Sequence, residues 1–111
     1  MRHIGDLLHN NTNLHILDLS SNQLKVSNAQ YLANMLENNT VLTTLYLWDN
    51  QIKEKGAEYS ADALEINRTL TTLDIGSNDI ADNGEQNLID AIQIHKTLTT
   101  LNLKAIPLLN S

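Results

Sequence analysis

Acidic side chains that could bind a cation have a recognisable spacing in one stretch of the chain, from Asp74 to Glu85. Glu85 is the twelfth residue counted from Asp74, which is the separation between the first and last ligands of an EF-hand calcium loop. The stretch departs from that pattern because Asp79 stands where the loop needs glycine, and Gly76 replaces a ligand. We therefore do not expect a calcium site here.

The other candidates for catalysis or metal binding also lack the arrangement that their chemistry needs. The four histidines share no helical spacing: His3, His9, His15 and His95. The absence of cysteine excludes disulfides, thiolate metal sites and cysteine nucleophiles. No pattern orders serine, histidine and aspartate into a catalytic set, and the chain has no glycine-rich phosphate loop. The sequence therefore predicts a protein that is not an enzyme and holds no metal or cofactor.

Two of the four aromatic residues, Tyr46 and Trp48, are separated by a single residue. In an extended strand such residues point to the same side. Tyrosine and tryptophan are typical anchors of protein–protein interfaces, because each combines a large apolar ring with a polar group. This pair is the strongest candidate for a binding site, and its position depends on the elements around it.

Composition limits the kind of protein that those elements can form. The chain has 111 residues, of which 41% are hydrophobic and 18% charged, so it fits one domain with a buried core. Its net charge of -6 argues against nucleic acid and anionic membranes as partners. No apolar run reaches the roughly 20 residues of a membrane span, and the first residues lack an apolar signal core. We expect a cytoplasmic protein.

An internal repeat organises the whole sequence. The pattern L-x-x-L-x-L-x-x-N-x-L begins at Leu14, Leu42 and Leu70, and its first part begins again at Leu98, each time after 28 residues. The leucines alternate with other residues, which is the period of a strand. The second half of each unit, as in residues 28–36, carries apolar residues at helical spacing. Each unit thus predicts a strand followed by a helix.

These motifs resemble the leucine-rich repeat family, and the constant 28-residue unit resembles its ribonuclease-inhibitor-like subclass. That subclass includes the C-terminal repeats of NOD-like receptors and the Ran GTPase-activating protein. The resemblance implies a right-handed α/β solenoid, with a parallel sheet on the concave side and helices on the convex side. It also implies that the amides of Asn22, Asn50 and Asn78 bond backbone groups of the adjoining loops. GTPase activation is not expected, because only the repeats match and no arginine finger is identifiable.

We expect one domain over residues 1–111. It comprises a partial repeat helix at 1–13, full repeats at 14–41, 42–69 and 70–97, and a terminal partial repeat or cap at 98–111. The pattern fails at Ile106, where the repeat would require asparagine. The chain is therefore expected to open inside a helix whose strand is missing, and to end where the repeat caps or decays.

The alternating pattern places a grid of side chains on the concave face. Row by row along the strands, the outward residues are Ile16, Asp18, Ser20; Thr44, Tyr46, Trp48; Thr72, Asp74, Gly76; and Thr100, Asn102, Lys104. Gly76 stands beside Trp48 and is expected to leave room for a partner side chain. Alternatively, Trp48 lies across Gly76 and fills a groove of its own surface.

The acidic side chains suggest which partner this face would accept. Repeats 14–41, 42–69 and 70–97 have net charges of −1, −2 and −4. Asp18, Asp49 and Asp74 are expected near the concave face, where they favour a basic protein surface. The charges of the helices fit a solvated face equally well.

The sequence therefore predicts a non-enzymatic protein–protein interaction module. Tyr46 and Trp48 are its expected anchors, with Asp18, Asp49 and Asp74 selecting a basic partner. Polar residues are expected to form the rim: Thr44, Thr72, Thr100 and Asn102. The alternative is a segment of a larger intracellular receptor or bacterial effector that mainly stacks on further repeats, and its bare repeat ends would self-associate.

Overall fold

A computed structural model describes residues 14–95 and 97–104, in which four short strands alternate with three helices. The strands are β1 (Ile16–Asp18), β2 (Thr44–Tyr46), β3 (Thr72–Asp74) and β4 (Thr100–Asn102). The helices are α2 (Val26–Asn38), α3 (Lys53–Ile66) and α4 (Ala81–His95). The partial helix expected at 1–13 and the cap expected around Ile106 lie outside the described residues.

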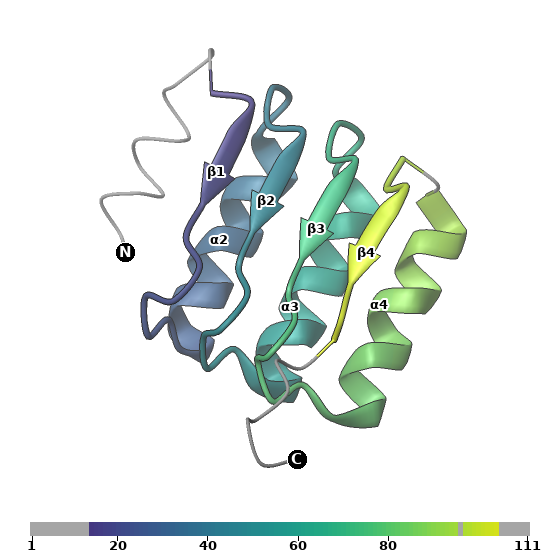
Figure 1. The fold of residues 1–111 in the computed structure, drawn as a ribbon. Coiled ribbons are helices and arrows are strands. Elements are labelled where there is room, and N and C mark those ends of the chain that lie inside the picture. The colour runs from purple at the N-terminus through teal and green to yellow at the C-terminus, as the bar shows by residue number, and fades with distance from the viewer. Residues whose placement is uncertain (1–13, 96, 105–111) are drawn as a thin grey trace.

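All four strands pair in parallel, in the order in which they occur in the chain (Figure 1). Every pairing joins residues 28 positions apart, as in Leu17 with Leu45 and Leu45 with Leu73. Beyond the strands the ladder continues, because the N–H of Leu47 donates to the carbonyl of Asp74 at 2.7 Å. The repeat period therefore sets the register of the sheet, as expected of an α/β solenoid.

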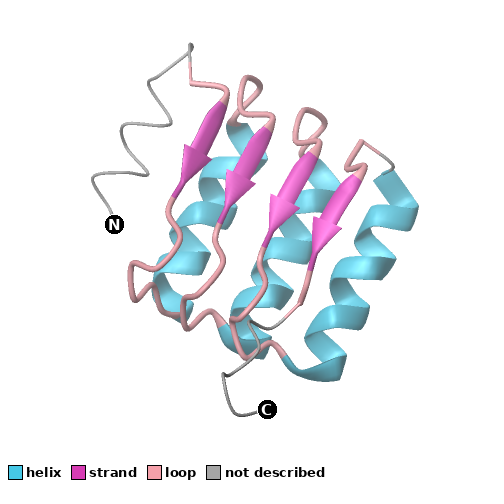
Figure 2. Ribbon diagram, in the orientation of Figure 1, coloured by secondary structure: helices cyan, strands magenta, loops and turns pink. Residues whose placement is uncertain are grey.

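The three helices cover one face of the sheet and leave the other face open (Figure 2). The core lies between these two layers. Leu45, Leu73 and Ile75 are at most 1% exposed, and they meet the apolar face of the helices. Residues of α2 at the predicted helical spacing, such as Ala29 and Leu36, are each 2% exposed. The predicted inward ladder of leucines is confirmed.

The core is thinner at the last strand. Leu101 of β4 and Leu103 just beyond it are only partly buried, whereas Leu45 of β2 and Leu47 just beyond it are fully buried. Apolar surface therefore remains accessible at this end of the stack. No helix within the described ranges is both long enough and apolar enough to cross a membrane.

A second series of asparagines joins the loops between helix and strand. Asn67 follows α3, is 3% exposed, and donates from Nδ2 to the carbonyls of Leu36 (2.7 Å) and Asn39 (3.2 Å) in the preceding repeat. Its Oδ1 accepts from the N–H groups of Thr69 and Leu70. Asn39 accepts from its own loop in the same way. These contacts join the loops that follow α2 and α3 and give hydrogen-bond partners to their backbone groups.

Candidate functional site

The sheet face opposite the helices, here called the strand face, carries the outward side chains of β1 to β4. Its first row is Ile16, Thr44, Thr72 and Thr100, and its second row is Asp18, Tyr46, Asp74 and Asn102. Each row is held in register by the parallel ladder. Eight outward side chains, most of them predicted site residues, therefore lie side by side in two straight rows.

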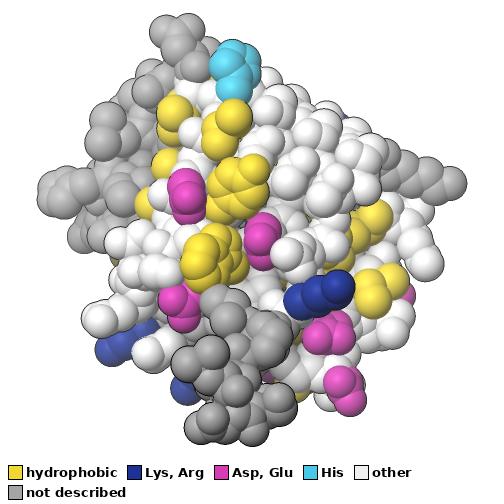
Figure 3. All heavy atoms as spheres, in the orientation of Figure 1, with side chains coloured by type: hydrophobic (Ala, Val, Ile, Leu, Met, Phe, Trp, Pro, Cys, Tyr) yellow, Lys and Arg dark blue, Asp and Glu magenta, His cyan; other side chains and the backbone are white. Residues whose placement is uncertain are grey.

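Tyr46 lies between two carboxylates, because its register partners are Asp18 on β1 and Asp74 on β3. Tyr46 and Trp48 are both half-buried, while Ile16 is 59% exposed. Figure 3 shows a band of hydrophobic side chains running down the strand face over β1 and β2, with acidic side chains on both sides of it. The face thus combines an apolar stripe with flanking negative charge.

Backbone hydrogen bonds hold these two carboxylates in place. Oδ1 of Asp18 accepts from the N–H of Ser20 at 3.0 Å, and Oδ1 of Asp74 accepts from the N–H of Gly76 at 3.1 Å. Asn102 forms the same local bond with the N–H of Lys104 at 3.0 Å. Its Nδ2 also donates to Oδ2 of Asp74 at 3.2 Å. The acidic groups are therefore positioned by the strand ends and do not depend on long, mobile side chains.

The acidic groups of this face have no basic partner among residues 14–95 and 97–104. The single ion pair in that part of the chain joins Lys55 and Glu58 on α3, at 3.5 Å. One further group near the aromatic pair is unsatisfied: Ser20 Oγ is buried and makes no hydrogen bond. Ser20 stands in the repeat position that Trp48 occupies in the next unit. The carboxylates of the face can therefore accept hydrogen bonds from a partner, whereas the buried Ser20 Oγ is not accessible to one.

The space at Gly76 is not open, which corrects the expectation from the sequence. Gly76 is buried, and a Cβ atom at this position would overlap the backbone carbonyl oxygen of Lys104. The chain leaving β4 therefore occupies the room that a partner side chain was expected to use. Glycine is required at this position because the backbone of the next unit passes so close.

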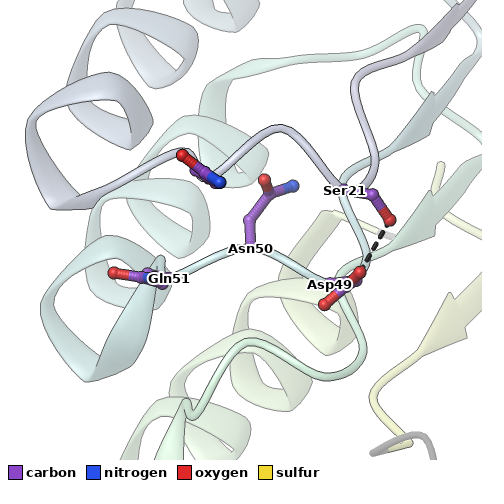
Figure 4. Close-up of a pocket in the computed structure, with 5 residues that line it drawn as sticks. Ser21, Asp49, Asn50 and Gln51 are labelled. Atoms are coloured by element: carbon purple, nitrogen blue, oxygen red, sulfur yellow. Dashed lines mark hydrogen bonds between the residues drawn. The ribbon is translucent and has the colours of Figure 1, made fainter.

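Asp49 lies away from the two rows, in the loop that follows β2. Its Oδ2 accepts from the hydroxyl of Ser21 at 2.7 Å, across one repeat (Figure 4). The two residues line a shallow polar hollow together with Gln23, Asn50 and Gln51. Asp49 has a φ angle of 60° and Ser21 one of 56°, so both adopt the left-handed backbone conformation. Asp49 borders the strand face and does not belong to its rows.

Asn50 and Asn78 connect successive loops from within the protein. Nδ2 of Asn50 donates to the carbonyls of Leu19 and Leu47, and its Oδ1 accepts from the N–H groups of Asn22 and Leu24. Asn78 is 2% exposed and makes the equivalent contacts one repeat later. Asn22 differs, because it is exposed and its amide donates to the carbonyl of Ser20 in its own turn.

Two groups of residues were missed as parts of the site or its support. Asn67 is not among the residues predicted from the sequence, although the 28-residue spacing of Asn11, Asn39 and Asn67 marks a second asparagine series. The unsatisfied hydroxyl of Ser20 has no sequence signal, because it depends on what packs around the atom. Among the described residues, no three His, Asp or Glu side chains gather as metal ligands would.

Comparisons with known proteins place this geometry in context. A family model described as Leucine Rich repeat matches residues 10–33, 38–59 and 67–88. The chain is similar to the structure of leiomodin-1 actin-binding site 2, with 25% identity and a TM-score of 0.86 over 98% of this chain. It is also similar to the tropomodulin C-terminal domain of Caenorhabditis elegans, with 12% identity and a TM-score of 0.65 over 96% of this chain. The second likeness shows the fold alone.

The chain spans 64% of the leiomodin-1 structure and 83% of the tropomodulin domain. No curated protein matches its sequence.

Proposed function

Because the chain belongs to the leucine-rich repeat family, we propose that it is a non-enzymatic module that binds a protein partner through its strand face. The observation that supports this most directly is the aromatic pair Tyr46 and Trp48, half-buried on an open sheet face beside the exposed Ile16. Apolar stripes of this kind, bordered by charge, mark contact surfaces. Thr44, Thr72 and Thr100 supply the polar rim.

The partner presents a basic surface. Asp18 and Asp74 border the aromatic stripe, Asp49 adds a third carboxylate at its edge, and none of them is paired with a described cation. The overall charge of -6 adds a long-range attraction for basic proteins. Actin is the first protein to test, because the leiomodin-1 structure that this chain resembles is titled as an actin-binding site.

Affinity capture with three matched baits tests the role of the face. The wild type, the double variant Tyr46→Ala/Trp48→Ala and the control Tyr31→Ala are immobilised and exposed to purified actin and to cell extract. Tyr31 is a suitable control because it is 45% exposed on α2, on the opposite side of the molecule. Far-ultraviolet circular dichroism verifies that each bait is folded.

A partner held by the wild type and by Tyr31→Ala, but lost by the double variant, supports binding through the strand face. If the double variant retains every partner of the wild type, the strand face is not the binding surface. If the wild type does not retain purified actin, actin is excluded as the partner. The role of the strand face is then decided by the proteins captured from the cell extract.

A second candidate function is stacking on further repeats in a larger receptor or effector. The observation that favours it is the accessible apolar surface at the β4 end, where Leu101 and Leu103 are only partly buried. Stacking predicts self-association of the isolated chain. Sedimentation at several concentrations measures it, and a monomer at all of them would argue against this function.

A further inference from the structure

We infer that the strand face receives an arginine side chain of the partner, with its guanidinium over the Tyr46 ring between the carboxylates of Asp18 and Asp74. This inference rests on the proposed function and specifies the partner chemistry that the face recognises. It follows from the register of three strands, the bonds that hold two carboxylates, and the absence of an ion pair to either of them among the described residues.

The register places one carboxylate on each side of the ring. Asp18, Tyr46 and Asp74 are direct partners across β1, β2 and β3. Neighbouring strands lie about 4.8 Å apart, so each carboxylate begins one strand spacing from the tyrosine. A guanidinium stacked on the ring face carries five N–H donors around its edge, which point toward carboxylates in this position.

Both carboxylates keep oxygen lone pairs for such a donor. In each, Oδ1 is occupied by a backbone N–H of its own strand end. Oδ2 of Asp18 has no partner among the described residues, and Oδ2 of Asp74 accepts one bond from Asn102. Since the backbone already fixes the orientation of these groups, little side-chain freedom is lost when a cation binds.

Although Lys104 follows β4 two residues beyond Asn102, the carboxylates and aromatic rings of the strand face make no ion pair or cation–π contact within the described part of the chain. Its one cation–π contact is on the helix side, where Lys55 Nζ lies 5.4 Å from the centre of the Tyr59 ring. An aromatic ring bordered by two carboxylates attracts a cation by both its quadrupole and its neighbours' charge. A neutral apolar side chain would leave both carboxylates facing the interface unpaired.

Arginine fits this arrangement better than lysine. Its flat guanidinium stacks on a ring while its edge donors reach both sides, whereas an ammonium is a compact point charge.

Trp48 provides the readout, because it is the only tryptophan in the chain and lies next to the inferred arginine position. The folded chain is titrated with three capped peptides, Gly-Arg-Gly, Gly-Lys-Gly and Gly-citrulline-Gly, while the indole N–H resonance is followed by nuclear magnetic resonance. Citrulline has the shape of arginine without its charge. We expect the arginine peptide to bind about fivefold or more tightly than the citrulline peptide, and more tightly than the lysine peptide.

The variant Asp18→Asn/Asp74→Asn removes both charges and keeps both local turns, as Asn102 shows by holding the same bond to its strand end. Its control is Asp62→Asn/Asp82→Asn, which removes the same charge from exposed positions on α3 and α4. We expect the first variant to lose the preference for arginine over citrulline, and the control to keep it.

Equal binding of arginine and citrulline peptides, or an unchanged preference in Asp18→Asn/Asp74→Asn, would overturn the inference. Equal binding of lysine would overturn the choice of arginine. Capture of the protein partner by the same variants distinguishes a wrong inference about arginine from a wrong proposal about the strand face. A partner that is lost by Tyr46→Ala/Trp48→Ala but retained by Asp18→Asn/Asp74→Asn binds the face without the inferred cation.

Discussion

The replacement Asn78→Ala tests whether buried amides hold the repeats together. Asn78 is 2% exposed, and its Nδ2 donates to the carbonyls of Leu47, Ile75 and Gly76 at 2.9, 3.0 and 2.9 Å. Its Oδ1 accepts from the N–H of Ile52 at 3.3 Å. One side chain thus bonds backbone groups of two successive repeats.

The magnitude follows from what each backbone group keeps after the amide is removed. The carbonyl of Leu47 retains its bond from Asn50, and that of Gly76 retains its bond from the N–H of Asp49. The carbonyl of Ile75 and the N–H of Ile52 lose their only partner among the described residues. Each unsatisfied buried group costs roughly 1–3 kcal/mol, so the two groups predict a loss of roughly 2–6 kcal/mol in the free energy of unfolding.

Asn22→Ala is the matched control, because it removes the same side chain from the same position of the preceding repeat. Asn22 is exposed and donates one bond, to the carbonyl of Ser20 at 3.0 Å, which water can replace. We expect Asn22→Ala to lower the free energy of unfolding by less than about 1 kcal/mol. Urea unfolding followed by circular dichroism measures both values. If Asn78→Ala is no more destabilising than Asn22→Ala, the argument for an amide connection between repeats is refuted.

Three further predictions concern the second asparagine series, the last strand and the core. Asn67→Ala should lower the free energy of unfolding by roughly 1–4 kcal/mol, because four backbone groups lose an amide partner. In the same urea titration the control Asn38→Ala, which removes an exposed asparagine at the end of α2, should lower this free energy by less than about 1 kcal/mol. Gly76→Ala should lower the melting temperature, because the added methyl group meets the backbone carbonyl of Lys104. Faster amide hydrogen exchange in β4 than in β2 would show that the variant destabilises the last strand. Leu73→Ala should lower the free energy of unfolding by roughly 2–5 kcal/mol and Leu101→Ala by clearly less, because Leu73 is 1% exposed and Leu101 only partly buried. Equal losses of stability in thermal unfolding would contradict the described core.

The architecture could be predicted because the same pattern of leucines occurs in every repeat. Leu17, Leu45, Leu73 and Leu101 recur every 28 residues, and each pairs in register with the next. One unit cannot bury its leucines, so an uninterrupted period leaves stacking as the way to form a core. The alternating pattern then places Tyr46 and Trp48 on the open side of the sheet.

The path of the backbone after the last strand could not be predicted. Gly76 shows why, since its repeat position indicated an open place on the sheet, whereas the carbonyl of Lys104 fills it. The repeat pattern assigns a residue to a face but does not describe a segment where the pattern itself ends. The burial of Asn67 could not be predicted for a different reason. A polar residue in a loop is as compatible with exposure to solvent as with a buried, hydrogen-bonded amide.

The position of Tyr46 gives the clearest connection between the scaffold and the proposed function. Its three counterparts in the other units are Asp18, Asp74 and Asn102, and each accepts a hydrogen bond from the backbone two residues further on. A tyrosine cannot form that bond, because its oxygen lies at the far end of a rigid ring. The second repeat therefore gives up a local contact that the other three use. Such departures from the local rule are expected where a residue serves binding instead of stability. Restoring the local contact with Tyr46→Asn should accordingly leave the fold intact and remove the ring from the strand face, because asparagine forms this bond at position 102 and adds no third carboxylate between Asp18 and Asp74.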